Sequence, residues 1–272
     1  MEFFSWLEYI LRISDPHQKI EQFNKFYAKY PNLPSEHFQK SKVWESPSFA
    51  KICTIVDPKD VPRRSKLHTE EGRATLLHAI AHIEYSAIDL ALDAAYRYKY
   101  MPKSFYDDWL EVAADECRHF LMIEELLHEL GFSYGDLPVH QGLFDAAMRS
   151  LELIDRMAVV PRYLEANGLD ANPKIIAKLG IFKDPFAKKM QEALEVILRE
   201  EIDHVKKGDK WFRWACAQEG IEDIVKEYLQ RVERVYPGTL HSKDFLNIEA
   251  RKDAGFSCEE IRLLAKREVE CG

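Results

Sequence analysis

The stretch HAIAHIEYSAIDLAL (residues 78–92) sets one glutamate, Glu84, in an otherwise apolar helical pattern. The same arrangement recurs in AADECRHFLMI (113–123), VPRYLEANGLD (160–170) and VILREEIDHVKKG (196–208). The glutamates in these segments are Glu116, Glu165 and Glu201, and a histidine follows two of them three residues later, as His119 and His204. Burying a carboxylate is costly unless a positive charge meets it. The pattern therefore indicates that cations are bound inside a helical protein.

Helical phase predicts that all four glutamates face the core. Residues three, four, seven and eleven positions apart share one face of a helix. Within seven positions of each glutamate, these offsets hold no charged side chain apart from the histidines of the two motifs, with the single exception of Arg162 on the face of Glu165. A solvated face would carry several charged residues there, so we expect the four carboxylates to be buried.

Three other pairings compete with this interpretation. Glu125 and His128 repeat the Glu-x-x-His spacing nine residues later, on the opposite side of the same helix, where we expect solvent. Glu152 is an alternative to Glu165, but its face is more mixed. His78 and His82 have a spacing that zinc sites use, yet they point away from Glu84, and we expect histidines of the core or of an interface.

Composition limits the class of protein. The 272 residues carry a net charge of −8 without a basic block, which argues against a general nucleic-acid surface. We expect the short run Arg63-Arg64-Ser65-Lys66 to be a solvated loop rather than a phosphate site. The five cysteines form no Cys-x-x-Cys pair and predict reduced thiols. No segment reaches the roughly 18 apolar residues of a membrane span, and a signal-peptide pattern is absent, so we expect a cytoplasmic protein without a membrane partner.

The periodicity predicts an all-α protein with one domain overall. Residues 1–70 are expected to form two short helices, at 2–13 and 16–29, and an extended, proline-containing wrap. Residues 71–218 are expected to form a four-helix bundle, and residues 219–272 a helical extension packed on it. The four long helices are predicted at 69–98, 104–130, 142–167 and 185–219, and the segment 236–245 is predicted to be a loop.

The residue types suit a dinuclear site of first-row metals. Carboxylate oxygens and imidazole nitrogens are ligands that Fe(II) and Mn(II) accept. Four carboxylates balance the four positive charges of two divalent ions, which leaves the buried site neutral. Two iron ions are the expected cofactor, and Mn/Fe or Mn/Mn pairs are the alternatives.

The order Glu, Glu-x-x-His, Glu, Glu-x-x-His resembles the ferritin-like di-iron carboxylate superfamily. The run Asp115-Glu116-Cys117-Arg118-His119 is similar to the Asp-Glu-x-Arg-His form of its oxygenases and ribonucleotide reductase relatives, and Leu164-Glu165-Ala166 resembles the third-helix ligand of tRNA-modifying hydroxylases. The phrases LLHAIAHIE, VPRYLEANGLD and EARKDAGF resemble bacterial ferritin-like proteins of unassigned function, and this likeness covers most of the chain.

This resemblance implies a role for each residue. Glu116 and Glu201 would bridge the two metal ions, and Glu84 and Glu165 would be terminal ligands. His119 and His204 would each complete one metal, and Asp115 and Glu200 would orient the histidines. The sequence departs from the family pattern in the second half, where Glu200 replaces the usual aspartate and Asp203 replaces an arginine.

The resemblance implies an O₂-dependent oxidoreductase of the monooxygenase kind, with a reductase as electron donor. Its substrate would be a small molecule or a tRNA-like molecule. Fold alone does not determine function. The alternatives are a ferritin-like protein that binds metal for iron oxidation, storage or sensing, and a bundle that only serves as an interaction scaffold.

Overall fold

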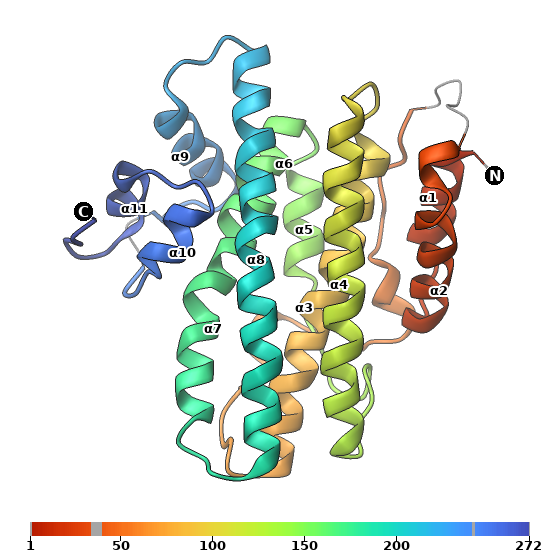
Figure 1. The fold of residues 1–272 in the computed structure, drawn as a ribbon, viewed down its shortest axis with the longest axis vertical. Coiled ribbons are helices and arrows are strands. Elements are labelled where there is room, and N and C mark those ends of the chain that lie inside the picture. Colours follow the sequence, from red (N-terminus) through yellow and green to blue (C-terminus); the bar gives the residue numbers. More distant parts are fainter. Residues whose placement is uncertain (1, 34–39, 241–242, 272) are drawn as a thin grey trace. The chain divides into compact units, whose positions relative to one another are not determined.

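A computed structural model describes residues 2–33, 40–240 and 243–271 of the chain (Figure 1). In these ranges the protein is helical without any β-strand, as the sequence predicts; only two isolated bridges occur, Ile55 with Val139 and Lys243 with Ala265. The chain divides into two compact units, Met1–Phe144 and Asp145–Gly272. The expected division at residues 70 and 218 stays a prediction.

The first unit is built on two long helices. Its elements are α1 (Phe3–Leu11), α2 (Pro16–Tyr27), three short 3-10 turns (Tyr30–Asn32, Ser48–Lys51, Pro58–Asp60), α3 (Glu70–Arg97) and α4 (Lys103–Glu129); α5 (Gly142–Arg149) begins at its end. The most extensive packing in the unit is between α3 and α4. These bounds agree with the helices predicted at 2–13, 16–29, 69–98 and 104–130.

The start of α3 is fixed by a cap and by close packing. The Thr69 hydroxyl accepts a hydrogen bond from the Gly72 N–H at 3.0 Å, the usual role of an N-cap residue. A Cβ atom at Gly72 would lie 2.2 Å from the backbone oxygen of Lys66, so only glycine fits there. Lys66 itself is left-handed, with φ 59°. The segment that precedes α3 is therefore held tightly against its first turn.

Buried polar contacts attach α2 and the segment before it to α3. The ammonium group of Lys19 is fully buried and pairs with Asp89, and it also donates to Ser48 at 2.8 Å. The Tyr85 hydroxyl donates to the backbone oxygen of Ser14 at 2.8 Å. A buried ammonium group is tolerated only when it is paired in this way, so these contacts set the position of α2.

The extended wrap joins the loop that follows α4. The Val56 N–H donates to the Val139 oxygen at 2.8 Å, and the Val139 N–H donates to Thr54 at 2.9 Å. The two segments thus share a short parallel bridge. Residues 34–39 of the predicted wrap, and residues 241–242 of the loop predicted at 236–245, lie outside the described residues.

The second unit is organised around α8 (Pro185–Gln218), which packs on its neighbours in that unit. The other elements are α6 (Leu153–Val159), a π-helical segment (Val160–Glu165), α7 (Ala166–Leu179), α9 (Ile224–Val235), α10 (Ile248–Asp253) and α11 (Cys258–Leu264). Asp184 caps α8 by accepting from the Ala187 N–H at 2.9 Å, and Pro185 occupies its first turn. The helix α10 was not expected from the sequence.

The prediction of one continuous helix over 142–167 is wrong. The helix is interrupted between Arg149 and Leu153, because polar side chains donate hydrogen bonds to backbone oxygens at the end of α5. The Ser150 hydroxyl donates to Ala146, and the buried Arg156 guanidinium donates to the oxygens of Ala147 and Ser150. Helical backbone then continues through the π-helical segment into α7, beyond the predicted end.

The π-helical segment follows from Pro161. A proline supplies no N–H and crowds the preceding turn, so the regular hydrogen-bond ladder is interrupted there. The Pro161 ring lies directly on Gly208 of α8, where a Cβ atom would come within 2.4 Å of the ring. Pro161 and Gly208 are thus a matched pair that allows the close approach of this segment to α8.

Arg162 links the π-helical segment to the C-terminal elements. Its side chain is fully buried and lies 2.8 Å from carboxylate oxygens of both Asp209 and Glu260. The guanidinium carbon also lies 4.3 Å from the centre of the Tyr228 ring, a cation–π contact. Burial raises the pKa of Glu260, but Arg162 and Ser257 lower it below its usual value. The charge of Arg162 is therefore neutralised within this cluster.

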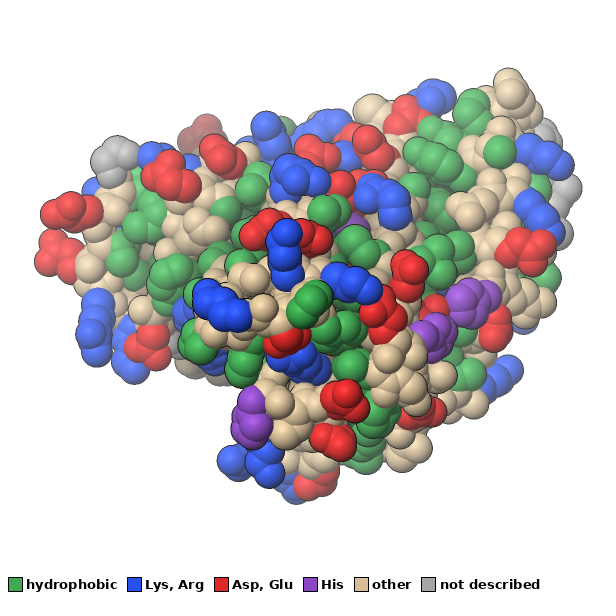
Figure 2. Space-filling view, turned by 60° about the horizontal axis from the view of Figure 1, so that its bottom comes forward, with side chains coloured by type: hydrophobic (Ala, Val, Ile, Leu, Met, Phe, Trp, Pro, Cys, Tyr) green, Lys and Arg blue, Asp and Glu red, His purple; other side chains and the backbone are tan. Residues whose placement is uncertain are grey.

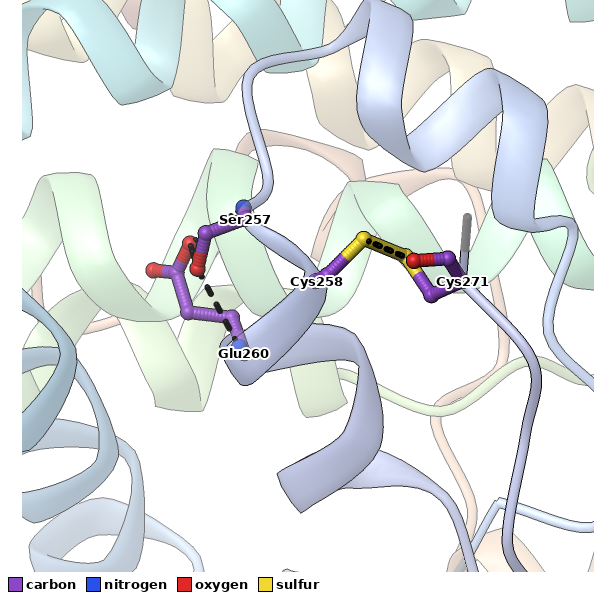
Figure 3. The surroundings of a disulfide bond; sticks show 4 residues. All are labelled: Ser257, Cys258, Glu260 and Cys271. Carbon is purple, nitrogen blue, oxygen red and sulfur yellow. Dashed lines mark hydrogen bonds between the residues drawn. A yellow bond between two sulfur atoms is a disulfide. The ribbon is translucent and has the colours of Figure 1, made fainter.

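A disulfide between Cys258 and Cys271 corrects the expectation that all cysteines are reduced (Figure 3). Ser257 caps α11 by exchanging hydrogen bonds with Glu260, and the end of the chain returns to the beginning of that helix, with the two Cα atoms 5.5 Å apart. A spacing of 13 residues matches no local cysteine motif, so this contact was invisible to pattern analysis. Cys53, Cys117 and Cys216 are free and buried.

Replacing Arg162 by methionine should destabilise the protein strongly. The variant removes the buried cation shared by Asp209 and Glu260 and leaves them only Arg213, which is 41 % exposed and lies 2.8 Å from Asp209 and 4.0 Å from Glu260. We therefore expect a loss of about 3 kcal/mol of unfolding free energy, the lower end of the range for a broken buried ion pair. Urea denaturation measures this loss, and Arg199→Met, at an exposed position, is the control. A loss no larger than that of the control would contradict the assignment of Arg162 as the charge that holds this cluster.

Candidate metal centre

Helices α3 and α4 bring two carboxylates and one imidazole together in the first unit. Glu84 lies on α3, and Glu116 and His119 lie one turn apart on α4. The Nδ1 atom of His119 is 3.3 Å from Oε2 of Glu84 and 3.4 Å from Oε2 of Glu116. Glu84 is 4 % exposed, and the other two side chains are fully buried. Their ligand atoms all lie within 4.8 Å of one another.

This group is electrostatically strained without a metal ion. Burial and the charge of Glu116 raise the pKa of Glu84 to about 8, although His119 lowers it. Burial alone would lower the pKa of His119, but hydrogen bonds and charges of Glu116 and Glu84 raise it to about 12. In metal-free protein both shifts favour extra protons on Glu84 and His119.

Helix α8 carries the matching pair in the second unit. His204 Nδ1 lies 3.9 Å from Oε2 of Glu201, and His204 is fully buried. Both Glu-x-x-His motifs thus direct an Nδ1 atom toward their own glutamate, as expected for residues one turn apart. Glu201 is 8 % exposed, so its predicted burial is confirmed.

Glu165 is less buried than the other three glutamates, whereas the sequence predicts that all four are buried. It is the last residue of the π-helical segment and is half-buried. Arg162, the charged neighbour that helical phase predicts on its face, forms ion pairs with Asp209 and Glu260. The π-helical geometry changes the angular position of every residue after Pro161, which a calculation at 100° per residue cannot reproduce.

The residues expected to orient the histidines are less buried. Asp115 is half-buried and its carboxylate pairs with Arg118 on the same helix. Glu200 is half-buried on α8. Asp203, which departs from the family pattern, is exposed and pairs with Lys207 at 2.6 Å. Their assigned roles stay predictions.

The competing pairings take the places that helical phase predicts. Glu125 and His128 are exposed on α4. Glu152 is exposed at the break before α6. His78 and His82 are buried and hydrogen-bonded to the loop after α4, so they are core histidines: Gly135 and Leu137 donate to His78 Nε2, and His82 contacts Tyr134 and the backbone of His140. Helical phase therefore distinguishes the buried motif of Glu116 and His119 from the exposed motif of Glu125 and His128.

The donor set in the first unit fits a metal ion. It combines hard carboxylate oxygens with an imidazole nitrogen, the ligands that iron and manganese accept. The buried Oε2 atom of Glu84 makes no hydrogen bond of good geometry within the described part of the chain. A cation among these three groups would replace the extra protons and satisfy that oxygen. Glu84, Glu116 and His119 therefore form a buried group that is able to hold a metal ion.

Comparison with known proteins places the chain in a family. The model of a family described as "Protein of unknown function (DUF455)" matches residues 12–262. The chain belongs to this family. An uncharacterized protein of Haemophilus influenzae is 36 % identical over 277 residues, covering 96 % of this chain and 92 % of the relative. No solved structure matches the chain. Family membership thus extends over both units and carries no assigned activity.

The surface offers no simple guide to partners. On the face that Figure 2 presents, acidic and basic side chains are interspersed between apolar ones. Among the described helices, none combines the length and the apolar character needed to cross a membrane.

The metal-free protein should lose stability as the pH rises. Glu84 keeps its proton up to about pH 8 in the folded state, whereas its ordinary pKa is 4.5. Between these values the unfolded chain binds fewer protons than the folded chain, so the free energy of unfolding falls, by a few kcal/mol in all. Glu84→Gln should reduce this dependence and leave the part above pH 6.5 that the raised pKa of His119 contributes. The measurement is urea denaturation of chelator-treated protein at pH 5.5 and pH 8.

The exposed Glu125 supplies the control for this experiment. Glu125→Gln should keep the wild-type pH dependence, because its carboxylate is in solvent. An unchanged slope in the Glu84→Gln protein would show that Glu84 does not hold an extra proton.

Proposed function

We propose that the protein is a dinuclear metal carboxylate protein with a ferritin-like four-helix bundle, and that it catalyses an O₂-dependent oxidation. The metal ligands would be Glu84, Glu116, His119, Glu165, Glu201 and His204. Two iron ions are the proposed cofactor, and Mn/Fe or Mn/Mn pairs are alternatives. The ligand set follows the residue pattern from which the resemblance to this superfamily was drawn.

The observation that carries the proposal is the buried group of Glu84, Glu116 and His119. Two carboxylates share one imidazole at 3.3 Å and 3.4 Å in a region without solvent. A structural role would be served better by apolar residues, because a buried ionic group seldom adds stability. Strongly perturbed titrating groups of this kind are typical of functional sites.

The second Glu-x-x-His motif supports two metal ions rather than one. Glu201 and His204 have the same spacing as Glu116 and His119 and are also buried, and in both pairs the histidine Nδ1 atom is the one nearest its glutamate, at 3.9 Å and 3.4 Å. Four carboxylates would neutralise two divalent ions, and each histidine would complete one of them.

The surroundings in the first unit favour oxidative chemistry. Trp109, Val112, Phe120 and Ile123 lie on α4 near the group and are buried. Such side chains keep water away from reactive species. Bound iron would supply the electrons that activate dioxygen. In a hydroxylation, one oxygen atom enters a C–H bond of the substrate, and the other leaves as water with two electrons and two protons from a reductase.

Metal content tests the ligand assignment. Protein purified without chelator should contain two metal ions per chain by elemental analysis. Glu116→Ala and His204→Ala should each lose at least one of them, because each removes a ligand. The double variant Glu125→Ala/His128→Ala is a matched control, with the same spacing on the exposed side of α4, and it should keep both. Wild-type metal content in either ligand variant would contradict the assignment.

Oxygen uptake separates oxidation of a substrate from storage. With a chemical reductant, the iron-loaded protein should consume oxygen repeatedly while its metal content stays at two per chain. Iron uptake far beyond two ions, in large assemblies, would instead identify a storage protein.

A further inference from the structure

A cavity of about 440 Å³ opens on the side of α3 that faces away from Glu84. Its α3 wall is formed by Thr75, His78, Ala79, His82 and Ile83. His82 lies about 200° around the helix from Glu84. The other walls are the segment 58–64 and the loop 137–140. All of these residues belong to the first unit. The volume is within the range of about 300–1,000 Å³ that is usual for small-molecule sites.

The walls of this pocket are held in place by backbone contacts. The bridge of Ile55 with Val139 joins the chain just before the segment 58–64 to the loop 137–140. Next to Arg63 and Arg64, the chain is attached to the first turns of α3: Thr69 donates to the Lys66 oxygen at 3.1 Å, and Arg73 donates to the Leu67 oxygen at 2.8 Å. The pocket is therefore preorganised.

The mouth of the pocket is positively charged. Arg63 and Arg64 line it and are exposed, and neither is paired with a carboxylate in the described part of the chain. The described lining contains no aspartate or glutamate. Two adjacent guanidinium groups supply the forked donors that suit a phosphate. In a protein with a net charge of −8 this is a local feature.

His78 adds a neutral donor to the pocket wall. Its Nε2 atom accepts hydrogen bonds from the backbone N–H groups of Gly135 at 3.0 Å and Leu137 at 3.3 Å, so the ring hydrogen is on Nδ1. No described residue accepts that hydrogen, although His78 is only 2 % exposed. Because His82 uses both ring nitrogens and His78 uses Nε2, the histidines are not arranged as metal ligands here.

The remaining lining is apolar. Ile83 is 43 % exposed, and Leu137 and Pro138 are half-buried beside it. Together with Pro58 and Pro62 they form a surface suited to the body of an organic molecule rather than to a free inorganic ion.

We propose that this pocket binds a small phosphomonoester, with the phosphate on Arg63 and Arg64 and the organic body against the apolar wall. The site is separate from the proposed metal centre and does not depend on it. It revises the expectation that the run Arg63-Arg64-Ser65-Lys66 is only a solvated loop. A small molecule is favoured over RNA because the site is a cavity and the chain, with a net charge of −8, has no basic block.

Calorimetric titration of the full-length protein with phenyl phosphate tests the proposal. We expect saturable binding, weaker binding of inorganic phosphate, and no binding of phenol. Arg63→Gln/Arg64→Gln should weaken phenyl phosphate binding by about tenfold or more, since two charge-assisted contacts are lost. The matched control Arg199→Gln/Arg262→Gln removes two exposed arginines outside the pocket and should bind as the wild type does.

A second measurement does not depend on variants. The imidazole ¹⁵N resonances of His78 should shift on addition of phenyl phosphate. Absence of binding, equal weakening in both double variants, or unshifted His78 resonances would overturn the proposal. Displacement of phenyl phosphate by a short single-stranded RNA without a terminal phosphate would overturn it too, because the site would then read a nucleic-acid backbone.

Discussion

The contact of two buried carboxylates with one imidazole constrains the first unit more than any other interaction. Glu84 and Glu116 are buried and lie on the two helices that pack most extensively in this unit. His119 lies between them and carries a single charge at most. Extra protons or cations must therefore accompany folding. The apolar residues around the group make this requirement stricter, because they exclude the solvent that would otherwise screen it.

Helical phase predicted the buried residues well where helices are long and regular. It placed Glu84, Glu116 and Glu201 inside, and it separated them from Glu125 and His128, which share the motif but are exposed. The reason is that a period of 3.6 residues persists along uninterrupted helices such as α3, α4 and α8. For Glu165 the same reasoning was weaker, because the π-helical segment shifts the phase after Pro161.

The features that sequence patterns did not predict all depend on contacts between distant residues or on hydrogen bonds from side chains to nearby backbone oxygens. Arg156 ends α5 by donating to two carbonyl oxygens, although the apolar pattern continues. Cys258 meets Cys271 because the chain end returns to α11. Arg162 is the charged exception on the predicted face of Glu165, and in the structure it pairs with Asp209 and Glu260. Arg63 and Arg64 line the same cavity as residues of α3, and the sequence alone does not show this cavity. A buried charge in a sequence therefore signals either a ligand site or a structural ion pair, and long-range partners decide which.

Anomalous X-ray diffraction from crystals of protein purified without chelator tests the central claim most directly. We expect two peaks at the iron or manganese edge, about 3.5–4 Å apart, with Glu84, Glu116 and His119 contacting one or both and with Glu201 and His204 among the remaining ligands. A crystal of metal-replete protein in which these carboxylates contact only His119, with no anomalous peak between them, would contradict it.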